Sequence, residues 1–281
     1  MIKLFTICLT LAVVMSCEKN SSDDSGDSGS NASTDSIRTL DSIYFVQLSD
    51  EFDNAANLSL WQRFNIVGGW PERFLQMDVN QTFAGSLYMK PMTCTWYGDF
   101  QAPYLYKRVG GDFVAVARIR TKGVLQDSSS RSYSLSGILA RKPRPVTPLT
   151  WTAGGENWVF VSNGFGSNPP IPNFETKTTV NSQSTLVLHP ADTGWVEIRM
   201  TRQGATFAMS RRYSGQNWVD LISYSRADMN IDTLEVGLEC YTDWQTVSAY
   251  GGNPFSFDTL KVTGGVPDLQ VWVDYIHFTR D

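Results

Sequence analysis

From about residue 43 onward, the sequence is built from short apolar runs separated by Gly, Pro and Asn. The run Asp112–Arg120 is apolar at nearly every position as far as Ala117, which is typical of a strand buried on both faces. The run Trp195–Thr201 alternates instead, with Val196, Ile198 and Met200 on one side and Glu197 and Arg199 on the other. That alternation predicts a sheet with one face in solvent.

The clearest stretch lies between Trp195 and Ser223, where WVEIRMT, ATFAMSR and NWVDLIS are joined at Gln203-Gly204 and Ser214-Gly215-Gln216. Glycine reaches the positive φ of tight hairpin turns, so the three runs predict an antiparallel meander. No segment shows a sustained 3.6-residue apolar period with caps, and the pattern predicts an all-β sandwich or barrel. The other expected strands are Tyr133–Arg141, Trp158–Asn163, Phe174–Val180, Thr185–His189, Leu234–Glu239 and Val271–Thr279.

The N-terminal segment reads as an export leader. Residues 1–17 have a basic start at Lys3, an apolar run to Met15, and Ser16 before Cys17. The apolar run is too short to span a bilayer comfortably and favours a cleaved signal. The segment resembles bacterial lipoprotein leaders, in which the cysteine is lipidated and becomes the mature N-terminus. An ordinary secretory signal with an incidental cysteine is the alternative.

Residues 18–42 form the predicted tether, since 18–36 are almost entirely Ser, Asp, Asn and Gly and offer little apolar surface to bury. Acidic residues directly after the cysteine resemble the export signal of surface lipoproteins in Bacteroidetes. This resemblance implies an outer-membrane protein held only by its lipid anchor and facing the cell exterior. The folded part is then a single domain over residues 43–281.

The charge and the cysteine and histidine content limit the kinds of partner and chemistry that we expect. The 281 residues carry a formal net charge of −5, and the densest basic cluster, Arg141, Lys142 and Arg144, is interrupted by proline. Nucleic-acid binding needs concentrated positive charge, so we expect no nucleic-acid partner. Cys94 and Cys240 are the only cysteines in the folded part, and the sequence leaves their pairing open. The two histidines, His189 and His277, read as structural or surface residues.

The chain also resembles a known family. The hairpin WVEIRMTRQGATFAMSRRYSGQNWVDLI, the opening SDEFDNAANLSLWQRF and the ending VWVDYIHFTRD are similar to strands of concanavalin A-like lectin/glucanase domains, most of all the DUF1349 or β-xylosidase C-terminal type. SGILAR and VGLEC resemble inner-sheet strands of the same superfamily. The resemblance spans about Ser49 to Asp281 and implies a jelly-roll sandwich. The proline-rich insert Pro143–Pro148 and the predicted Gly/Pro loop Asn163–Asn173 depart from the family and would reshape a binding rim.

Catalytic motifs of the resembled enzymes are missing. Glycoside cleavage uses two carboxylates about 5–10 Å apart, and no E-x-D-x-x-E or E-x-D-x-E spacing occurs here. The acidic run Asp50-Glu51-Asp53 belongs to the entry of the first strand, and the acids Asp232, Glu235 and Glu239 read as solvated strand positions. The Arg, Gln-x-His and Tyr-x-Lys patterns of jelly-roll lyases are also missing. We therefore assign no catalytic residue and lean against an enzyme.

The resemblance implies one metal site, because domains of this superfamily often hold a structural calcium between the first and last strands. The matching positions are Glu51 and Asp274, with backbone carbonyls completing an oxygen shell. A solvated acidic turn and a strand-edge aspartate explain the same residues without a metal. No other cofactor is required.

Aromatic residues provide the candidate binding site. Trp61, Trp158, Trp195, Trp218 and Trp272 fall in strand patterns, where we expect burial. Other aromatic residues lie in loops or at strand ends, and their rings suit the apolar faces of sugars. Core packing is the alternative for each ring taken singly. The predicted carbohydrate site consists of Trp70, Trp96, Tyr97, Arg141, Tyr241 and Trp244.

Taken together, the sequence predicts a surface lipoprotein with a non-catalytic, carbohydrate-binding β-sandwich in a glycan-utilisation system. The partner would be a polysaccharide or oligosaccharide. One alternative is a glycoside hydrolase or polysaccharide lyase with an atypical active site. The other is a structural or adhesion module that binds protein.

Overall fold

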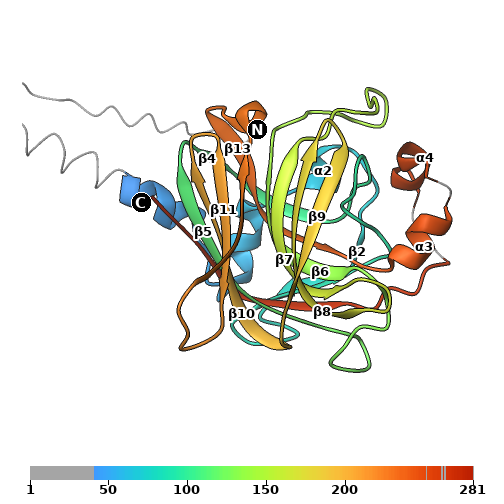
Figure 1. Cartoon of the computed structure of the whole chain (residues 1–281), viewed down its shortest axis with the longest axis horizontal. Helices are drawn as coiled ribbons and strands as arrows, with labels where there is room; N and C mark the ends of the chain where they lie inside the picture. Colours follow the sequence, from blue (N-terminus) through green and yellow to red (C-terminus); the bar gives the residue numbers. More distant parts are fainter. Residues whose placement is uncertain (1–40, 251, 261, 263, 281) are drawn as a thin grey trace, which may run out of the picture. The chain divides into compact units, whose positions relative to one another are not determined.

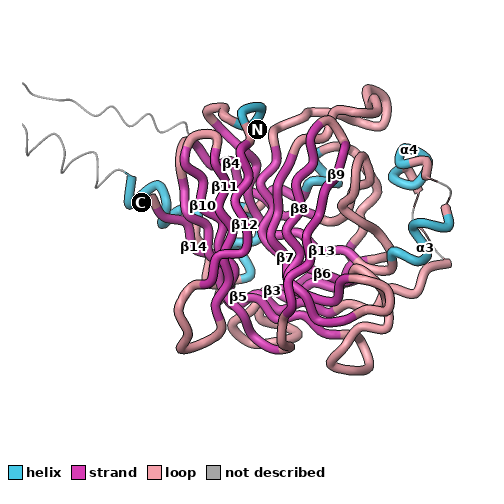
Figure 2. Tube along the Cα trace, viewed as in Figure 1, coloured by secondary structure: helices cyan, strands magenta, loops and turns pink. Residues whose placement is uncertain are grey.

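The computed structural model describes residues 41–250, 252–260, 262 and 264–280. All of them lie in one compact unit, Thr39–Asp281. Two seven-stranded antiparallel sheets pack face to face (Figure 1), and Figure 2 shows that strands make up most of the body. The predicted antiparallel β-sandwich is therefore confirmed. The leader with Cys17, and the tether up to residue 40, lie outside the described residues.

The first sheet has the strand order β1-β4-β13-β6-β7-β8-β9. Its strands are β1 (Gln62–Arg63), β4 (Tyr104–Gly110), β13 (Thr233–Tyr241), β6 (Ser134–Arg141), β7 (Trp158–Gly166), β8 (Ile171–Val180) and β9 (Gln183–Pro190).

The second sheet has the order β12-β11-β10-β5-β14-β3-β2. Its strands are β12 (Val219–Ser225), β11 (Thr206–Arg212), β10 (Gly194–Gln203), β5 (Phe113–Lys122), β14 (Gln270–Thr279), β3 (Leu87–Pro91) and β2 (Phe74–Val79). The predicted meander is β10-β11-β12, whose strands pair in sequence order.

The main core lies between the two sheets, where alternate residues of each strand point inward. In β10, Val196, Ile198 and Met200 are buried and the residues between them are partly exposed, as the alternation predicts. In β5 the prediction of burial on both faces is wrong beyond the first three residues, because Val116, Arg118 and Arg120 are half-exposed. No loop or helix of the described chain covers them, so a two-sided apolar pattern ends there.

Two other expectations are corrected. The stretch Asn163–Asn173 is mostly strand, because β7 runs to Gly166 and β8 begins at Ile171. The opening motif is not a regular first strand: Asp50 makes an isolated bridge to Ile276 and a 3₁₀ helix follows. Asp50 accepts hydrogen bonds from Phe52 N and Trp61 Nε1, which fixes this segment against the sandwich.

Short helices occupy the connections, although the sequence pattern predicted none. One or two turns are too short to show a 3.6-residue period, so periodicity does not detect them. Residues 41–48 are helical. The other helices are η1 (Ala55–Leu60), α2 (Phe64–Val67), η2 (Ala227–Met229), α3 (Trp244–Ala249) and α4 (Pro254–Asp258).

The centre of the first sheet depends on a glycine at position 237 of β13. A Cβ added to Gly237 would lie 2.0 Å from the Leu105 carbonyl oxygen of the neighbouring strand. We expect Gly237→Ala to lower the free energy of unfolding by about 1–3 kcal/mol, as overpacking does. Urea unfolding measures the loss. Gly264→Ala is the control, since its Cβ would meet no atom within 4 Å, and equal stability of the two variants would contradict the prediction.

Candidate functional site

The outward face of the first sheet carries a second hydrophobic cluster, separate from the main core. We call this surface the covered face. Its strand residues are Tyr104, Tyr106, Leu135, Leu139, Trp158, Phe160 and Tyr241. Phe64 of α2 and Trp96 of the β3–β4 loop pack on top, with the Trp96 ring edge-on to Trp158 at 6.0 Å. Most of this face is therefore closed to solvent.

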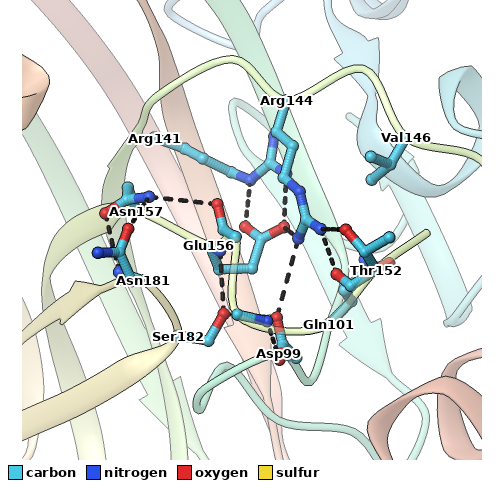
Figure 3. A network of polar contacts seen from close by, with 12 residues as sticks. Asp99, Gln101, Arg141, Arg144, Val146, Thr152, Glu156, Asn157, Asn181 and Ser182 are labelled. Carbon is cyan, nitrogen blue, oxygen red and sulfur yellow. Dashed lines mark hydrogen bonds and ion pairs between the residues drawn. The ribbon is translucent and has the colours of Figure 1, made fainter. Parts of the chain in front are cut away.

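A network of buried charges holds the loops in place over the covered face (Figure 3). Arg141 at the end of β6 donates to both carboxylate oxygens of Glu156, at 2.8 and 2.9 Å, and to Glu235 at 2.8 Å. Arg144 donates to Glu156 at 3.0 Å. Ser182 joins the β3–β4 loop to this network, since its hydroxyl donates to Asp99 and accepts from Glu156 N.

The network explains how Glu156 stays ionised inside the protein. Burial alone would raise the pKa of Glu156, but the charges and hydrogen bonds of Arg141 and Arg144 hold it below its ordinary value. Burial would likewise lower the pKa of Arg141, and Glu156 and Glu235 raise it. Arg141 is thus a structural cation, buried and paired with both Glu156 and Glu235.

One part of the covered face stays open. A pocket of about 200 Å³ lies next to β8 and β9 and is lined by Thr95, Tyr97, Tyr133, Lys177, Leu186 and Trp244. We call it the aromatic pocket. The Trp244 ring lies 5.6 Å from the Tyr97 ring at 58° and 6.4 Å from the Tyr133 ring at 75°. Three inclined rings therefore surround one hollow.

Lys177 of β8 supplies the positive charge of the aromatic pocket, although only 1% of the residue is exposed. Its Nζ pairs with Glu175 Oε1 at 2.6 Å and donates to the Trp96 carbonyl at 2.8 Å. The same Nζ lies 5.7 Å from the centre of the Tyr97 ring and 5.2 Å from that of Tyr241. Aromatic faces attract cations at these distances, so the rings help to hold the Lys177 side chain in place.

Glu239 of β13 lies on the same face, fully buried, and its carboxylate has no hydrogen-bond partner among the described residues. Burial raises the pKa of Glu239 well above its ordinary value; Lys177 opposes this shift and Glu175 adds to it. The neutral acid is therefore favoured. The sequence interpretation of Glu239 and Glu235 as solvated acids is wrong, since both side chains are buried.

The six predicted site residues divide into two groups. Tyr97, 40% exposed, and Trp244, half-buried, both line the aromatic pocket. The other four are buried: Trp70, Trp96, Arg141 and Tyr241. Lys177 of β8 and Leu186 of β9 were missed, together with the loop residues Thr95 and Tyr133, because no local pattern shows which residues meet at the pocket.

The tryptophans expected in the core also divide. Trp61 and Trp158 are buried. Trp195, Trp218 and Trp272 are half-exposed on the outer face of the second sheet, which corrects the prediction. Each of them lies beside arginine side chains that cover part of its ring.

The two positions suggested for calcium lie in separate ion pairs. Glu51 Oε1 contacts His277 Nε2 at 2.6 Å, and Asp274 Oδ2 accepts from Arg118 at 2.5 Å. Among the described residues, no group of three or more His, Cys, Asp or Glu side chains is arranged to hold a metal. Calcium binding at Glu51 and Asp274 therefore stays a prediction without further support.

Cys94 and Cys240 are both buried as free thiols. Burial raises the pKa of Cys94 to about 12, so the reactive thiolate is disfavoured. Within the described part of the chain, no helix is long and apolar enough to cross a membrane.

No family model matches the chain, and no curated protein matches it. Several solved structures are similar to it. A functionally unknown protein from Saccharomyces cerevisiae is 13% identical with a TM-score of 0.53, and the match covers 80% of this chain and 98% of that one. A variant of the GH43 protein BlXynB from Bacillus licheniformis is 12% identical with a TM-score of 0.55, covering 84% of this chain and 39% of that one.

A xylan β-1,4-xylosidase from Bacillus halodurans is 10% identical with a TM-score of 0.50, covering 83% of this chain and 39% of that one. The chain thus spans about two fifths of each hydrolase. At these identities the likeness shows the fold alone. The class is therefore a β-sandwich of the kind found in glycoside hydrolases, consistent with the concanavalin A-like resemblance at the level of fold.

Glu239 makes stability depend on pH in a defined direction. Its folded-state pKa is raised above the ordinary value of 4.5, so above that pH the folded protein holds a proton that the unfolded chain releases. Stability therefore falls as pH rises through this window, by up to about 1.4 kcal/mol per pH unit for one group. In Glu239→Gln this contribution disappears, and we expect a flatter dependence of unfolding free energy on pH.

Denaturant unfolding of the wild type and Glu239→Gln between about pH 5 and pH 8 measures the difference in slope. Asp258, whose pKa burial also raises well above its ordinary value, is present in both proteins and cancels. Asp127→Asn removes a carboxylate that is 77% exposed and serves as the charge control. Parallel curves for the wild type and Glu239→Gln would contradict the prediction.

Proposed function

We propose that the protein binds carbohydrate at the aromatic pocket, as the non-catalytic sandwich of a surface lipoprotein in a glycan-utilisation system. The observation that carries the proposal is the pair of Tyr97, which is exposed, and Trp244, which is half-buried, beside the buried Lys177. An aromatic face stacks on the apolar C–H face of a sugar ring. The Lys177 ammonium and the Thr95 hydroxyl would direct hydrogen bonds to sugar hydroxyls.

The size of the aromatic pocket suggests how much of a glycan it takes. Its volume of about 200 Å³ is below the ~300–1,000 Å³ typical of small-molecule sites. It therefore suits one sugar unit, with the rest of a chain in solvent. Two similar structures are a GH43 protein and a xylan β-1,4-xylosidase, which makes xylan the first probe to try.

The burial of the acids supports binding without catalysis. Hydrolysis requires a proton donor and a second carboxylate that both reach the scissile bond. Glu175 and Glu239 are fully buried and do not line the aromatic pocket. Glu235 is held by Arg141. Glu175 and Glu239 are therefore closed to a substrate in the aromatic pocket.

A glycoside hydrolase is the second candidate, and one observation favours it. Glu239, whose pKa burial raises well above its ordinary value, lies on one face with the Glu175–Lys177 ion pair, and two carboxyl groups in different surroundings are what acid and base roles require. Release of reducing sugar from a polysaccharide panel, lost in Glu239→Gln, would establish this function in place of binding alone.

Binding at the aromatic pocket predicts a defined mutant effect. We expect Tyr97→Ala with Trp244→Ala to weaken binding about tenfold or more, because each ring contributes roughly 0.5–1.5 kcal/mol beyond its buried area. Affinity electrophoresis in gels containing xylan or other polysaccharides measures retardation. Phe83→Ala removes a 51% exposed ring elsewhere and should bind normally.

Unchanged retardation of the folded double variant would reject the aromatic pocket as the site. If no glycan retards the wild type while the protein captures proteins from a cell surface, the adhesion alternative replaces the proposal.

The lipid anchor is a separate part of the proposal and rests on residues 1–42. We expect Cys17→Ser to move the protein from the membrane fraction to a soluble fraction, because the thiol that would carry lipid is lost. Protease added to intact cells should digest the domain of the wild type if it faces the exterior. Full protection of the domain, with the membrane intact, would contradict surface display.

A further inference from the structure

The outer face of the second sheet carries an ordered pattern of aromatic and arginine side chains, which we call the open face. Strand register places Trp195, Arg120 and Trp272 in one row across β10, β5 and β14. The next row along the strands contains Arg212, Glu197, Arg118 and Tyr275. Aromatic rings and guanidinium groups therefore alternate over at least four neighbouring strands.

The guanidinium groups are held against the rings. The Cζ atom of Arg118 lies 4.7 Å from the centre of the Trp195 ring. Arg199 and Arg212 lie 4.4 and 4.5 Å from that of Trp218, which precedes β12. Stacking restricts these long side chains, so less conformational entropy is lost when they bind a ligand.

A depression of about 490 Å³ lies in the open face. Its walls include Trp195, Arg118, Glu197, Arg212 and Tyr275. Arg212 makes two hydrogen bonds to Glu197, at 2.5 and 2.8 Å, and the Tyr275 hydroxyl donates to the same carboxylate. These contacts fix the polar groups of the depression before any ligand arrives.

The arginines of the open face differ in their carboxylate partners. Glu197 and Asp274 neutralise Arg212 and Arg118. Arg199 has only Asp220 at 3.9 Å, whose side chain is 88% exposed. Arg120 pairs with no carboxylate in the described part of the chain. Two guanidinium groups are thus left to bind an anion.

We infer that the open face binds an anionic polysaccharide, with the indoles of Trp195 and Trp272 stacking on sugar rings and Arg120 and Arg199 binding carboxylate or sulfate groups. The two indoles stand two strands apart, about 10 Å, with Arg120 between them. A guanidinium group binds such oxyanions through paired N–H donors. This surface lies on the other sheet from the aromatic pocket, so the inference does not depend on the proposed function.

The test compares polymers that differ only in charge. The full chain is run in affinity gels containing polygalacturonate or its methyl ester, and dextran sulfate or dextran. We expect retardation by a charged polymer, weakened by added salt, and none by its neutral counterpart. The dextran sulfate and polygalacturonate arms identify which anionic group is preferred.

Arg120→Gln with Arg199→Gln should weaken binding to the charged polymer at least tenfold and reduce its salt dependence. Tyr97→Ala with Trp244→Ala should leave this binding unchanged, which separates the two surfaces. If the glutamine variant fails to fold, Arg120→Lys with Arg199→Lys takes its place. Lysine keeps the charge but lacks the paired N–H donors of arginine, so this variant should bind more weakly than the wild type.

Equal retardation by the esterified and charged polymers would overturn the inference, as would normal binding by the folded variants. Sedimentation of the wild type and the glutamine variant tests whether the open face instead forms a dimer. A dimer that dissociates on Arg120→Gln with Arg199→Gln would show that the open face is an interface between two copies instead.

Discussion

The ion pair between Arg141 and Glu156 determines which part of the first sheet a ligand can reach. Both side chains are almost completely buried, and a charge removed from water is tolerated only when it is paired and hydrogen-bonded. Removing one partner from such a pair typically costs about 3–5 kcal/mol. Because Glu156 lies in the β6–β7 connection, the pair fixes that loop against β6. Ser182 links the loop to the β8–β9 turn, and Arg144 links it to Asp99 of the β3–β4 loop.

The fixed loops turn an outward sheet face into a second interior. Trp96, Trp158 and Tyr241 become core residues, and an open groove along the whole sheet is excluded. What stays accessible is the corner beside β8 and β9, where Tyr97 and Trp244 meet over Lys177. The same closure buries Glu175 and Glu239, and it makes the neutral form of Glu239 favourable. Loop attachment therefore decides both where a ligand fits and which acids remain out of reach.

The strands β5 to β14 could be predicted because apolar runs and glycine turns are local features of the sequence. The strands β1 to β4 were not predicted, and a helix as short as α2 shows no period. Whether loops cover an outward sheet face depends on contacts between residues that are far apart in the sequence. Arg141, for example, binds Glu235, 94 residues away. Arg141 and Trp96 were therefore assigned to a surface, whereas Trp195 and Trp272 were assigned to the core, since alternation does not distinguish covered from open faces.

Arginine and aromatic side chains occur together on both outward faces, and their surroundings give them different roles. Arg141 lies over Phe64 at 4.7 Å and binds the carboxylates of Glu156 and Glu235. Its charge therefore stabilises the fold. Arg120 lies over Trp272 at 5.9 Å in partial contact with water, where a guanidinium group keeps its hydration until a ligand replaces it. The number of carboxylates around each arginine, more than the presence of arginine and tryptophan, separates a structural cation from a binding one.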